Sequence, residues 1–158
     1  MDLEQIFEMY MNDIYRYLFS LTQHHAQAED LLQETFIKVH ITLLAKPIDD
    51  IRPWLFKVAY YSYIDWIRKQ KRIILTNEIN QVDERTPEQL IIEQHSYLHL
   101  LNLLNEIKPI ERHAILLCDV HECTYEQVAE ILNVNINTVK SHVARGRKKM
   151  RELLSKGE

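Results

Sequence analysis

Hydrophobic residues recur at helical spacing along most of the chain. In the first stretch they follow one another at intervals of three and four residues, at Leu3, Phe7, Tyr10, Ile14, Leu18 and Leu21. His24 and His25 interrupt this pattern, and a second one runs from Ala28 to Leu43. Such spacing is typical of amphipathic helices, and no alternating pattern long enough for a sheet occurs. The pattern predicts an all-α protein.

Breaks in the pattern divide the chain into segments. Pro47 and the acidic pair that follows it predict a loop. Pro53 suits the first turn of a third helix, which we expect from Trp54 to about Lys71. Residues 73–87 show no sustained period and are rich in Asn, Gln and acidic side chains, which is typical of a linker.

Helical spacing then returns in the second half of the chain. It extends over residues 88–106, and Pro109 predicts a further short helix through Val120. We therefore expect two small helical bundles joined by a flexible acidic linker. The expected boundaries are 1–72 for the first bundle, 73–95 for the linker and 96–158 for the second bundle.

The C-terminal part has the signals of a helix-turn-helix. Thr124 and Gln127 form a capping box, Asn133 suits a left-handed turn, and Asn135 can cap a second helix from Ile136 to about Leu154. A helix-turn-helix places its second helix in the major groove, where Lys and Arg reach guanine and Ser and Thr reach bases or phosphates. The outward face of this helix is expected to present Thr138, Lys140, Ser141, His142 and Arg145.

Residues 54–72 combine aromatic and basic side chains. The aromatic ones are too many around the helix for one buried stripe, which favours rings that stack on unpaired bases beside cations that hold the backbone. The alternative is that these rings belong to the core. The candidates for binding single-stranded DNA are Tyr60, Tyr61, Tyr63, Trp66, Arg68, Lys69, Lys71 and Arg72.

The charge of the chain is strongly uneven. The 158 residues carry a formal net charge of −4. Residues 1–36 hold seven acids and one base, whereas residues 140–151 hold six bases and no acid. Together with the basic run 68–72, this distribution indicates two contacts with a polyanion.

Composition narrows the class of protein further. Two glycines are too few for a P-loop or a dinucleotide fingerprint, and two cysteines form no disulfide framework. Asp2 and Glu4 stand where a secretion signal would be positively charged, and no apolar run is long enough to span a membrane. We expect a cytoplasmic protein.

Four blocks of sequence resemble the extracytoplasmic-function (ECF) group of bacterial sigma factors in the sigma-70 family. They are residues 28–36, 54–72, 104–121 and 124–154, which stand in the order of that family with its acidic linker between them. The N-terminal stretch is similar to the sigma-M type of this group. The resemblance implies an all-α fold of sigma region 2 and sigma region 4, with the helix-turn-helix in region 4.

The resemblance also implies partners and roles. The β′ clamp helices of core RNA polymerase would bind Asp30, Gln33, Glu34 and Phe36. The aromatic and basic helix would recognise and open the −10 promoter element, and the β flap would contact region 4. The −35 element would be bound by Thr138, Lys140, Ser141, His142, Ala144, Arg145 and Lys148.

Further expectations follow from the same resemblance. The chain would be a monomer when free, would need no cofactor or metal, and would have no enzymatic activity. An anti-sigma factor, typically membrane-anchored, would control it, and its target genes would form a stress-responsive regulon. The chain departs from the family pattern at Tyr61, Asn137 and His142, which affects base recognition. Gly146 inside the second helix should cost about 1 kcal/mol relative to Ala.

Three other classes of protein fit the sequence less well. A metal or redox sensor could use His113, Cys118, His121 and Cys123, although their spacing matches no standard zinc pattern. A helix-turn-helix repressor would leave the first 72 residues unexplained. An enzyme would need a nucleophile and base motif that the scattered His and Glu residues do not form.

Overall fold

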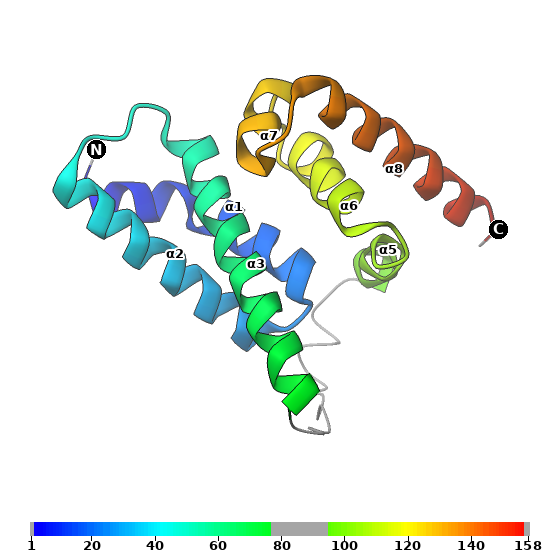
Figure 1. Cartoon of the computed structure of the whole chain (residues 1–158), viewed down its shortest axis with the longest axis horizontal. Coiled ribbons are helices and arrows are strands. Elements are labelled where there is room, and N and C mark those ends of the chain that lie inside the picture. Colours follow the sequence, from blue (N-terminus) through cyan, green and yellow to red (C-terminus); the bar gives the residue numbers. More distant parts are fainter. Residues whose placement is uncertain (1, 77–94, 157–158) are drawn as a thin grey trace. The chain divides into compact units, whose positions relative to one another are not determined.

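The computed structural model describes residues 2–76 and 95–156, which form helices and contain no strand (Figure 1). The chain divides into two compact units, residues 1–85 and 86–158. The prediction of an all-α protein is therefore confirmed. None of the helices in the described residues is long and apolar enough to cross a membrane. Most of the predicted linker, residues 77–94, lies outside the described residues.

The first unit contains three helices, α1 (Leu3–Thr22), α2 (His25–Ala45) and α3 (Ile51–Thr76). Each packs against the other two, and each contributes apolar side chains to one core. Burial of these side chains is the main stabilising contribution, at about 1.5–3 kcal/mol for each large one. The largest fully buried residues of this core are Ile6, Ile14, Tyr17, Leu18, Leu31, Leu55 and Phe56.

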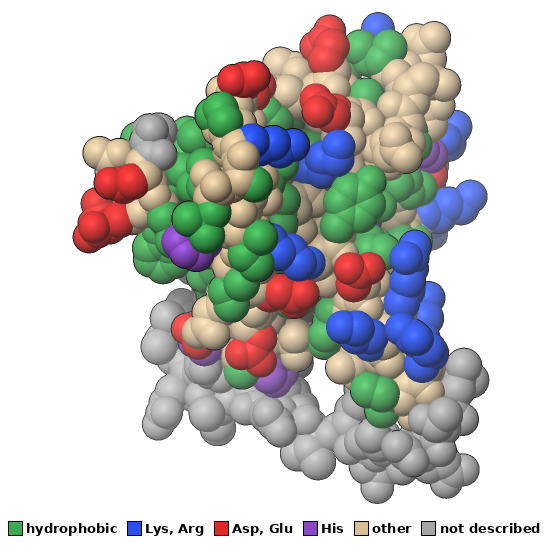
Figure 2. All heavy atoms as spheres, turned by 60° about the vertical axis from the view of Figure 1, so that its left-hand side comes forward, with side chains coloured by type: hydrophobic (Ala, Val, Ile, Leu, Met, Phe, Trp, Pro, Cys, Tyr) green, Lys and Arg blue, Asp and Glu red, His purple; other side chains and the backbone are tan. Residues whose placement is uncertain are grey.

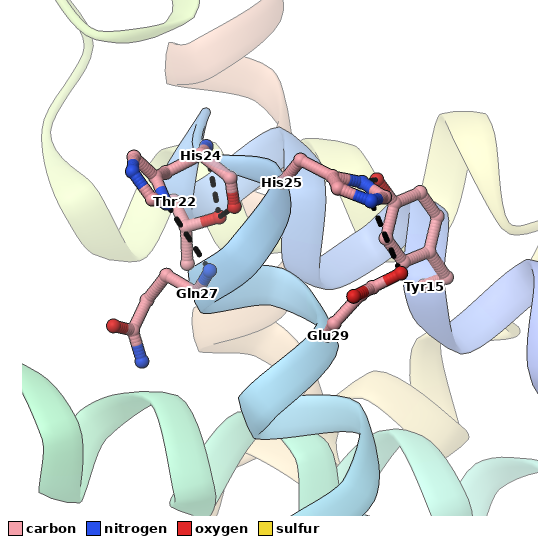
Figure 3. Close-up of polar contacts among 6 residues, drawn as sticks. All are labelled: Tyr15, Thr22, His24, His25, Gln27 and Glu29. Atoms are coloured by element: carbon pink, nitrogen blue, oxygen red, sulfur yellow. Dashed lines mark hydrogen bonds and ion pairs between the residues drawn. The ribbon is translucent and has the colours of Figure 1, made fainter. Parts of the chain in front are cut away.

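Two adjacent histidines shape the turn between α1 and α2 (Figure 3). His24 is the N-cap of α2, and its Nδ1 accepts a hydrogen bond of 3.1 Å from the backbone N–H of Gln27. His25 lies between Tyr15, whose hydroxyl is 2.5 Å from Nδ1, and Glu29, whose carboxylate is 3.0 Å from Nε2. These contacts fix the start of α2 against α1, so the break in periodicity at the two histidines is confirmed as a helix boundary.

Helix α3 is longer than the sequence pattern predicted. It begins at Ile51 and continues to Thr76, beyond the expected end near Lys71. Residues 73–76 are therefore helical, so α3 extends into the first residues of the expected linker. The basic run 68–72 has no helix breaker after it, so the backbone can continue in the same conformation.

The second unit contains α5 (His95–Leu104), α6 (Pro109–Ile115), η1 (Leu116–Val120), α7 (Tyr125–Leu132) and α8 (Ile136–Lys156). The short element η1 is a π-helix that continues α6 without a break. The backbone N–H of His121 donates to the carbonyl of Leu116 at 3.0 Å, five residues earlier, and that of Cys123 donates to Leu117 at 2.9 Å. The predicted helix 109–120 is confirmed, and its last turn is wider than an α-helical one.

Helices α7 and α8 form the predicted helix-turn-helix. The Thr124 side chain accepts from the N–H of Gln127, whose side chain accepts from the N–H of Thr124 in return. Asn133 has a φ of 57°, the left-handed conformation that asparagine tolerates. The Asn135 side chain accepts from the N–H of Thr138 at 2.8 Å and caps α8. All three sequence signals are confirmed.

Gly146 lies where α8 crosses α6. A Cβ at this position would be 2.3 Å from Cδ1 of Ile115 and 3.4 Å from the backbone oxygen of Glu111. A glycine inside a helix lowers its stability, but here the missing side chain also allows the two helices to approach closely.

Candidate nucleic-acid and polymerase interfaces

The candidate residues for the −35 element lie along the surface of α8. Thr138 and His142 are half-buried, and the Thr138 hydroxyl donates to the Asn135 cap. Nζ of Lys140 lies 5.9 Å from the ring centroid of Tyr125 in α7, a contact that restrains the lysine beside the first helix of the motif. The exposed members of the set are Lys140, Ser141, Ala144, Arg145 and Lys148.

Arg145 is held by two neighbours within its own unit. Its Nε donates to Oε2 of Glu111 at 3.4 Å, and its Nη2 is 3.1 Å from Nδ1 of His142. Because arginine only donates, His142 accepts this bond with an unprotonated Nδ1. These two contacts join Arg145 to α6 and to the preceding turn of α8.

Arg147 belongs to the basic run of α8 but is engaged elsewhere. Its Nε and Nη2 donate to the two carboxylate oxygens of Asp119 in η1, at 3.0 and 2.6 Å. The hydrogen bonds to Asp119 raise the pKa of the guanidinium. This bidentate ion pair attaches α8 to η1, so the role of Arg147 is to stabilise the fold. Nothing in the sequence pattern points to this pair, because the two residues are far apart along the chain.

The aromatic residues of α3 divide into exposed and buried ones. Tyr61 is exposed, Tyr60 and Trp66 are half-buried, and Tyr63 is only 5% exposed. The expectation that Tyr63 faces a partner is wrong, because its ring lies in the core beside Trp66 at a centroid distance of 6.0 Å. Tyr60 and Tyr61 meet edge to face, and burial raises the pKa of Tyr60. The basic residues Arg68, Lys69, Lys71 and Arg72 are all exposed.

A pocket of about 340 Å³ opens between α2 and α3 beside Tyr61. Its lining is mainly apolar, with one cation, Lys38, whose Nζ donates to Ser62 at 2.9 Å and lies 3.3 Å from Glu34. Sequence analysis missed this pocket, since its residues come from two helices. They are Lys38, Ile41, Thr42, Trp54, Val58 and Tyr61.

The candidate polymerase-binding residues lie on α2. Asp30, Gln33 and Glu34 are exposed, as an interface requires. Phe36 is only 7% exposed, because Phe7 of α1 packs edge to face on it at 5.0 Å. Phe36 therefore lies beneath the exposed surface of α2. The expectation that it forms part of the binding surface is wrong.

The same face of α2 has an apolar half that the sequence analysis did not identify. Ile37, Ile41 and Leu44 are 60%, 60% and 76% exposed. Their spacing of three and four residues places them along one side of the helix, next to the acidic residues. Such a row of exposed apolar side chains is typical of an interaction surface.

Charged side chains are not evenly spread over the surface. Figure 2 shows Lys and Arg side chains gathered into a group on the face that it displays. Exposed Lys and Arg residues lie at the end of α3 and along α8, where the sequence predicted two basic clusters.

The candidate metal ligands do not come together into a site. No group of three or more His, Cys, Asp or Glu side chains that could hold a metal ion occurs among residues 2–76 and 95–156. Burial raises the pKa of Cys118 to about 11, with Asp119 adding to the effect, so this thiol is a weak nucleophile at neutral pH. His113 and Cys123 are buried in the second unit, and the Cys123 thiol lies 4.0 Å from the backbone oxygen of His121.

Comparison with protein families gives matches in both units. The family model of sigma-70 region 2 matches residues 6–73, and that of sigma-70 region 4 matches residues 97–150. Both matched regions belong to sigma-70 factors, which are transcription initiation factors.

Individual relatives place the chain more closely. The ECF RNA polymerase sigma factor SigM of Bacillus subtilis is 31% identical over 159 residues, covering 99% of this chain and 98% of SigM. The RNA polymerase sigma factor YlaC of the same organism is 29% identical over 98% of this chain and 92% of YlaC. The solved sigma factor RpoE of Bartonella quintana, in complex with the anti-sigma factor NepR, matches with a TM-score of 0.83 and 25% identity over 96% of each chain.

The chain belongs to the ECF group of RNA polymerase sigma factors. Sigma factors are non-enzymatic transcription initiation factors that bind core RNA polymerase and promoter DNA. The identification from sequence is confirmed.

Proposed function

We propose that the two units of this sigma factor have separate tasks. The exposed face of α2 binds core RNA polymerase through Asp30, Gln33 and Glu34 and through the apolar row that continues from them. An acidic surface that becomes apolar suits a protein partner better than DNA. This division follows the expected regions, with the first one extended to Thr76 at the end of α3.

The exposed part of α3 binds the opened −10 element. Tyr60, Tyr61 and Trp66 supply rings for stacking on nucleobases. The four exposed Lys and Arg residues at the end of the helix supply positive charge. The pocket beside Tyr61 can hold one unstacked nucleobase. Its lining is mainly apolar, and it also contains the ammonium group of Lys38 and the hydroxyl of Thr42.

Helix α8 binds the −35 element in the major groove. The observation that carries this proposal is the helix-turn-helix itself, with Lys140, Ser141 and Arg145 exposed on the early part of its second helix. Lys148 lies two turns beyond Lys140, where contacts to phosphates are expected.

The experiment compares two lysines of the same helix. Lys140→Ala should lose about 1–3 kcal/mol on the correct −35 element and flatten discrimination among sequences. Lys148→Ala should weaken binding to all sequences alike and reduce the salt slope by about one. The measurement is holoenzyme binding to a panel of −35 variants at several salt concentrations. Equal losses from both variants on every sequence would contradict base recognition by α8.

An anti-sigma factor is the expected regulator of this chain. The similar sigma factor RpoE was solved with the anti-sigma factor NepR bound. We propose that an anti-sigma factor binds this chain as well and keeps it from core polymerase until a stress signal arrives. Copurification of the tagged chain with and without the signal tests this, with core polymerase replacing the anti-sigma factor after induction.

A further inference from the structure

Glu111 of α6 is a buried charge in the second unit. It is 6% exposed, whereas acidic side chains are almost never buried unless they are paired. Among the described residues, its ion-pair partner is Arg145, whose Nε lies 3.4 Å from Oε2. The Arg145 side chain is 58% exposed. The pair therefore connects the interior of the unit with the surface of α8.

We propose that Glu111 is a positioning residue that orients Arg145 for recognition of a guanine in the −35 element. This inference rests on the proposed function of α8. Arginine binds the O6 and N7 atoms of guanine through two parallel donors. With Nε held by Glu111 and one N–H of Nη2 directed at His142, the N–H groups of Nη1 and the second N–H of Nη2 are left to form this fork.

A second contact restrains the same guanidinium. Nη2 of Arg145 lies 3.1 Å from Nδ1 of His142, one turn earlier on α8. Side chains restrained in their bound geometry lose less conformational freedom on binding, so more of the contact energy appears as affinity. Glu111 and His142 together hold Arg145 from two sides.

The backbone around Arg145 is fixed as well. The neighbouring Gly146 is buried against Ile115 and the backbone oxygen of Glu111, at the distances of a close helix crossing. Arg145 therefore leaves α8 at the edge of the crossing, next to the Glu111 carboxylate. The geometry follows from the packing of α6 on α8 and does not depend on the DNA.

The chain contains a matched control for this role. Asp119 and Arg147 form another carboxylate–arginine pair between η1 and α8, with distances of 3.0 and 2.6 Å. Arg147 follows Arg145 by two residues, so it lies on a different side of the helix. Loss of this pair should affect the attachment of α8 without affecting the orientation of Arg145.

The experiment measures base discrimination by the full-length chain in holoenzyme on a panel of −35 variants. Arg145→Ala should reduce discrimination roughly 5- to 150-fold at one base pair. Glu111→Leu should cause a partial loss, about threefold to tenfold, at that same base pair, with Glu111→Gln between it and the original chain. Asp119→Asn should leave discrimination within about twofold. The salt slope should be unchanged in both Glu111 variants, because no phosphate contact is removed.

A double variant separates positioning from a general effect on folding. In the Arg145→Ala background, Glu111→Leu should cause no further loss of discrimination, because it acts through Arg145. A Glu111 effect that persists in this background, or that is equal on every sequence, would overturn the proposal. Full discrimination in the folded Glu111→Gln and Glu111→Leu variants would overturn it too, while leaving base recognition by Arg145 intact. If Arg145→Ala itself keeps discrimination, both the positioning role and the proposed contact are wrong.

Discussion

His113 is a titratable side chain enclosed in the second unit. Burial lowers its pKa from 6.5 to about 3, and the positive charge of Arg112 adds to the shift. The neutral ring is therefore the form that packs in the folded protein, although the same ring takes up a proton readily when the chain unfolds.

This shift predicts a pH dependence of stability with a definite sign. Between pH 6.5 and about 3 the unfolded chain binds a proton at His113 that the folded chain does not bind. The free energy of unfolding should therefore fall with decreasing pH in this window, by up to about 1.4 kcal/mol per pH unit. Urea unfolding of the full chain, followed through amide NMR signals of α6 and α7, measures this slope.

Two variants test the assignment of the slope to His113. His113→Leu should remove this part of the pH dependence, because no titratable group remains at the position. His99→Leu, which replaces an exposed histidine of α5, should leave the slope in place because His113 is still present. An unchanged slope in the His113 variant would assign the effect to other groups.

The hydrogen-bond partners of the candidate DNA-binding residues could not be predicted from the sequence. Lys140, Ser141 and Arg145 were correctly expected on the surface of α8, because helical periodicity separates outward from inward positions. Periodicity does not show which residue of another helix meets them. The pairs Arg145–Glu111 and Arg147–Asp119 join residues 34 and 28 positions apart, so only the fold brings them together.

At the scale of single elements, α8 depends on the absence of a side chain at Gly146. Gly146→Ala would improve helix propensity by about 1 kcal/mol. The added Cβ would meet Cδ1 of Ile115 at 2.3 Å, and overpacking of this kind costs about 1–3 kcal/mol. We expect a net loss of stability and of promoter binding, measured by thermal unfolding and by holoenzyme affinity.

The double variant Gly146→Ala with Ile115→Val provides the control. Valine lacks the Cδ1 atom that would be closest to the new Cβ, so part of the lost stability should return. A stabilised Gly146→Ala single variant would show instead that Ile115 can move aside.

In α3, exposure separates two roles that the sequence pattern combined. Replacing Tyr60, Tyr61 and Trp66 by Leu should impair promoter opening more than closed-complex formation, because stacking needs unpaired bases. Tyr63→Leu should instead destabilise the first unit, since this ring is 5% exposed. Permanganate footprinting of the opened bases and thermal unfolding distinguish the two effects.

A template with a pre-melted −10 bubble tests the opening step directly. It should restore part of the transcription lost in the triple variant, because the bases are then already unpaired. Absence of any rescue would argue against a role of these rings in opening.

The burial of Tyr63 could not be predicted from the sequence, for a physical reason. The aromatic residues of α3 surround the helix, and hydrophobic spacing cannot decide which of several rings faces the core when each is apolar enough for either place. Hydrophobic spacing also predicted the end of α3 too early. The hydrophobic pattern stops at the run of Lys and Arg residues, although these residues are good helix formers.

At the scale of the whole molecule, the two units should differ in partner. The first unit presents the acidic and apolar face of α2, and the second presents the basic face of α8. We expect a fragment of residues 1–85 to retain most of the affinity for core polymerase. Pull-down of core enzyme by this fragment and by residues 86–158 measures the division.

A charge reversal in the full chain complements the fragments. Glu34→Lys should weaken binding of core polymerase while leaving the unfolding temperature nearly unchanged, because Glu34 is exposed. Retention of core affinity only by the C-terminal fragment would contradict the proposed role of α2.

Fold class was the most predictable level of the molecule. The helical period, the capping box at Thr124 and the asparagines at 133 and 135 act locally, so each was readable without knowledge of the fold. The pocket between α2 and α3 and the apolar row on α2 were not predicted, since exposure of Ile37, Ile41 and Leu44 depends on where α1 and α3 pack.

The π-helical turn at Leu116–Val120 has a consequence for how this lineage can change in length. A π turn contains one residue more than an α turn, so an α-helix can absorb a single deletion there without a break. Such a deletion would rotate everything downstream by about 100° relative to α6. Glu111 and Ile115 of α6 would then no longer face Arg145 and Gly146 of α8, and the helix-turn-helix would lose its packing on α6. The protein can therefore tolerate a missing residue in its loops more easily than in this turn.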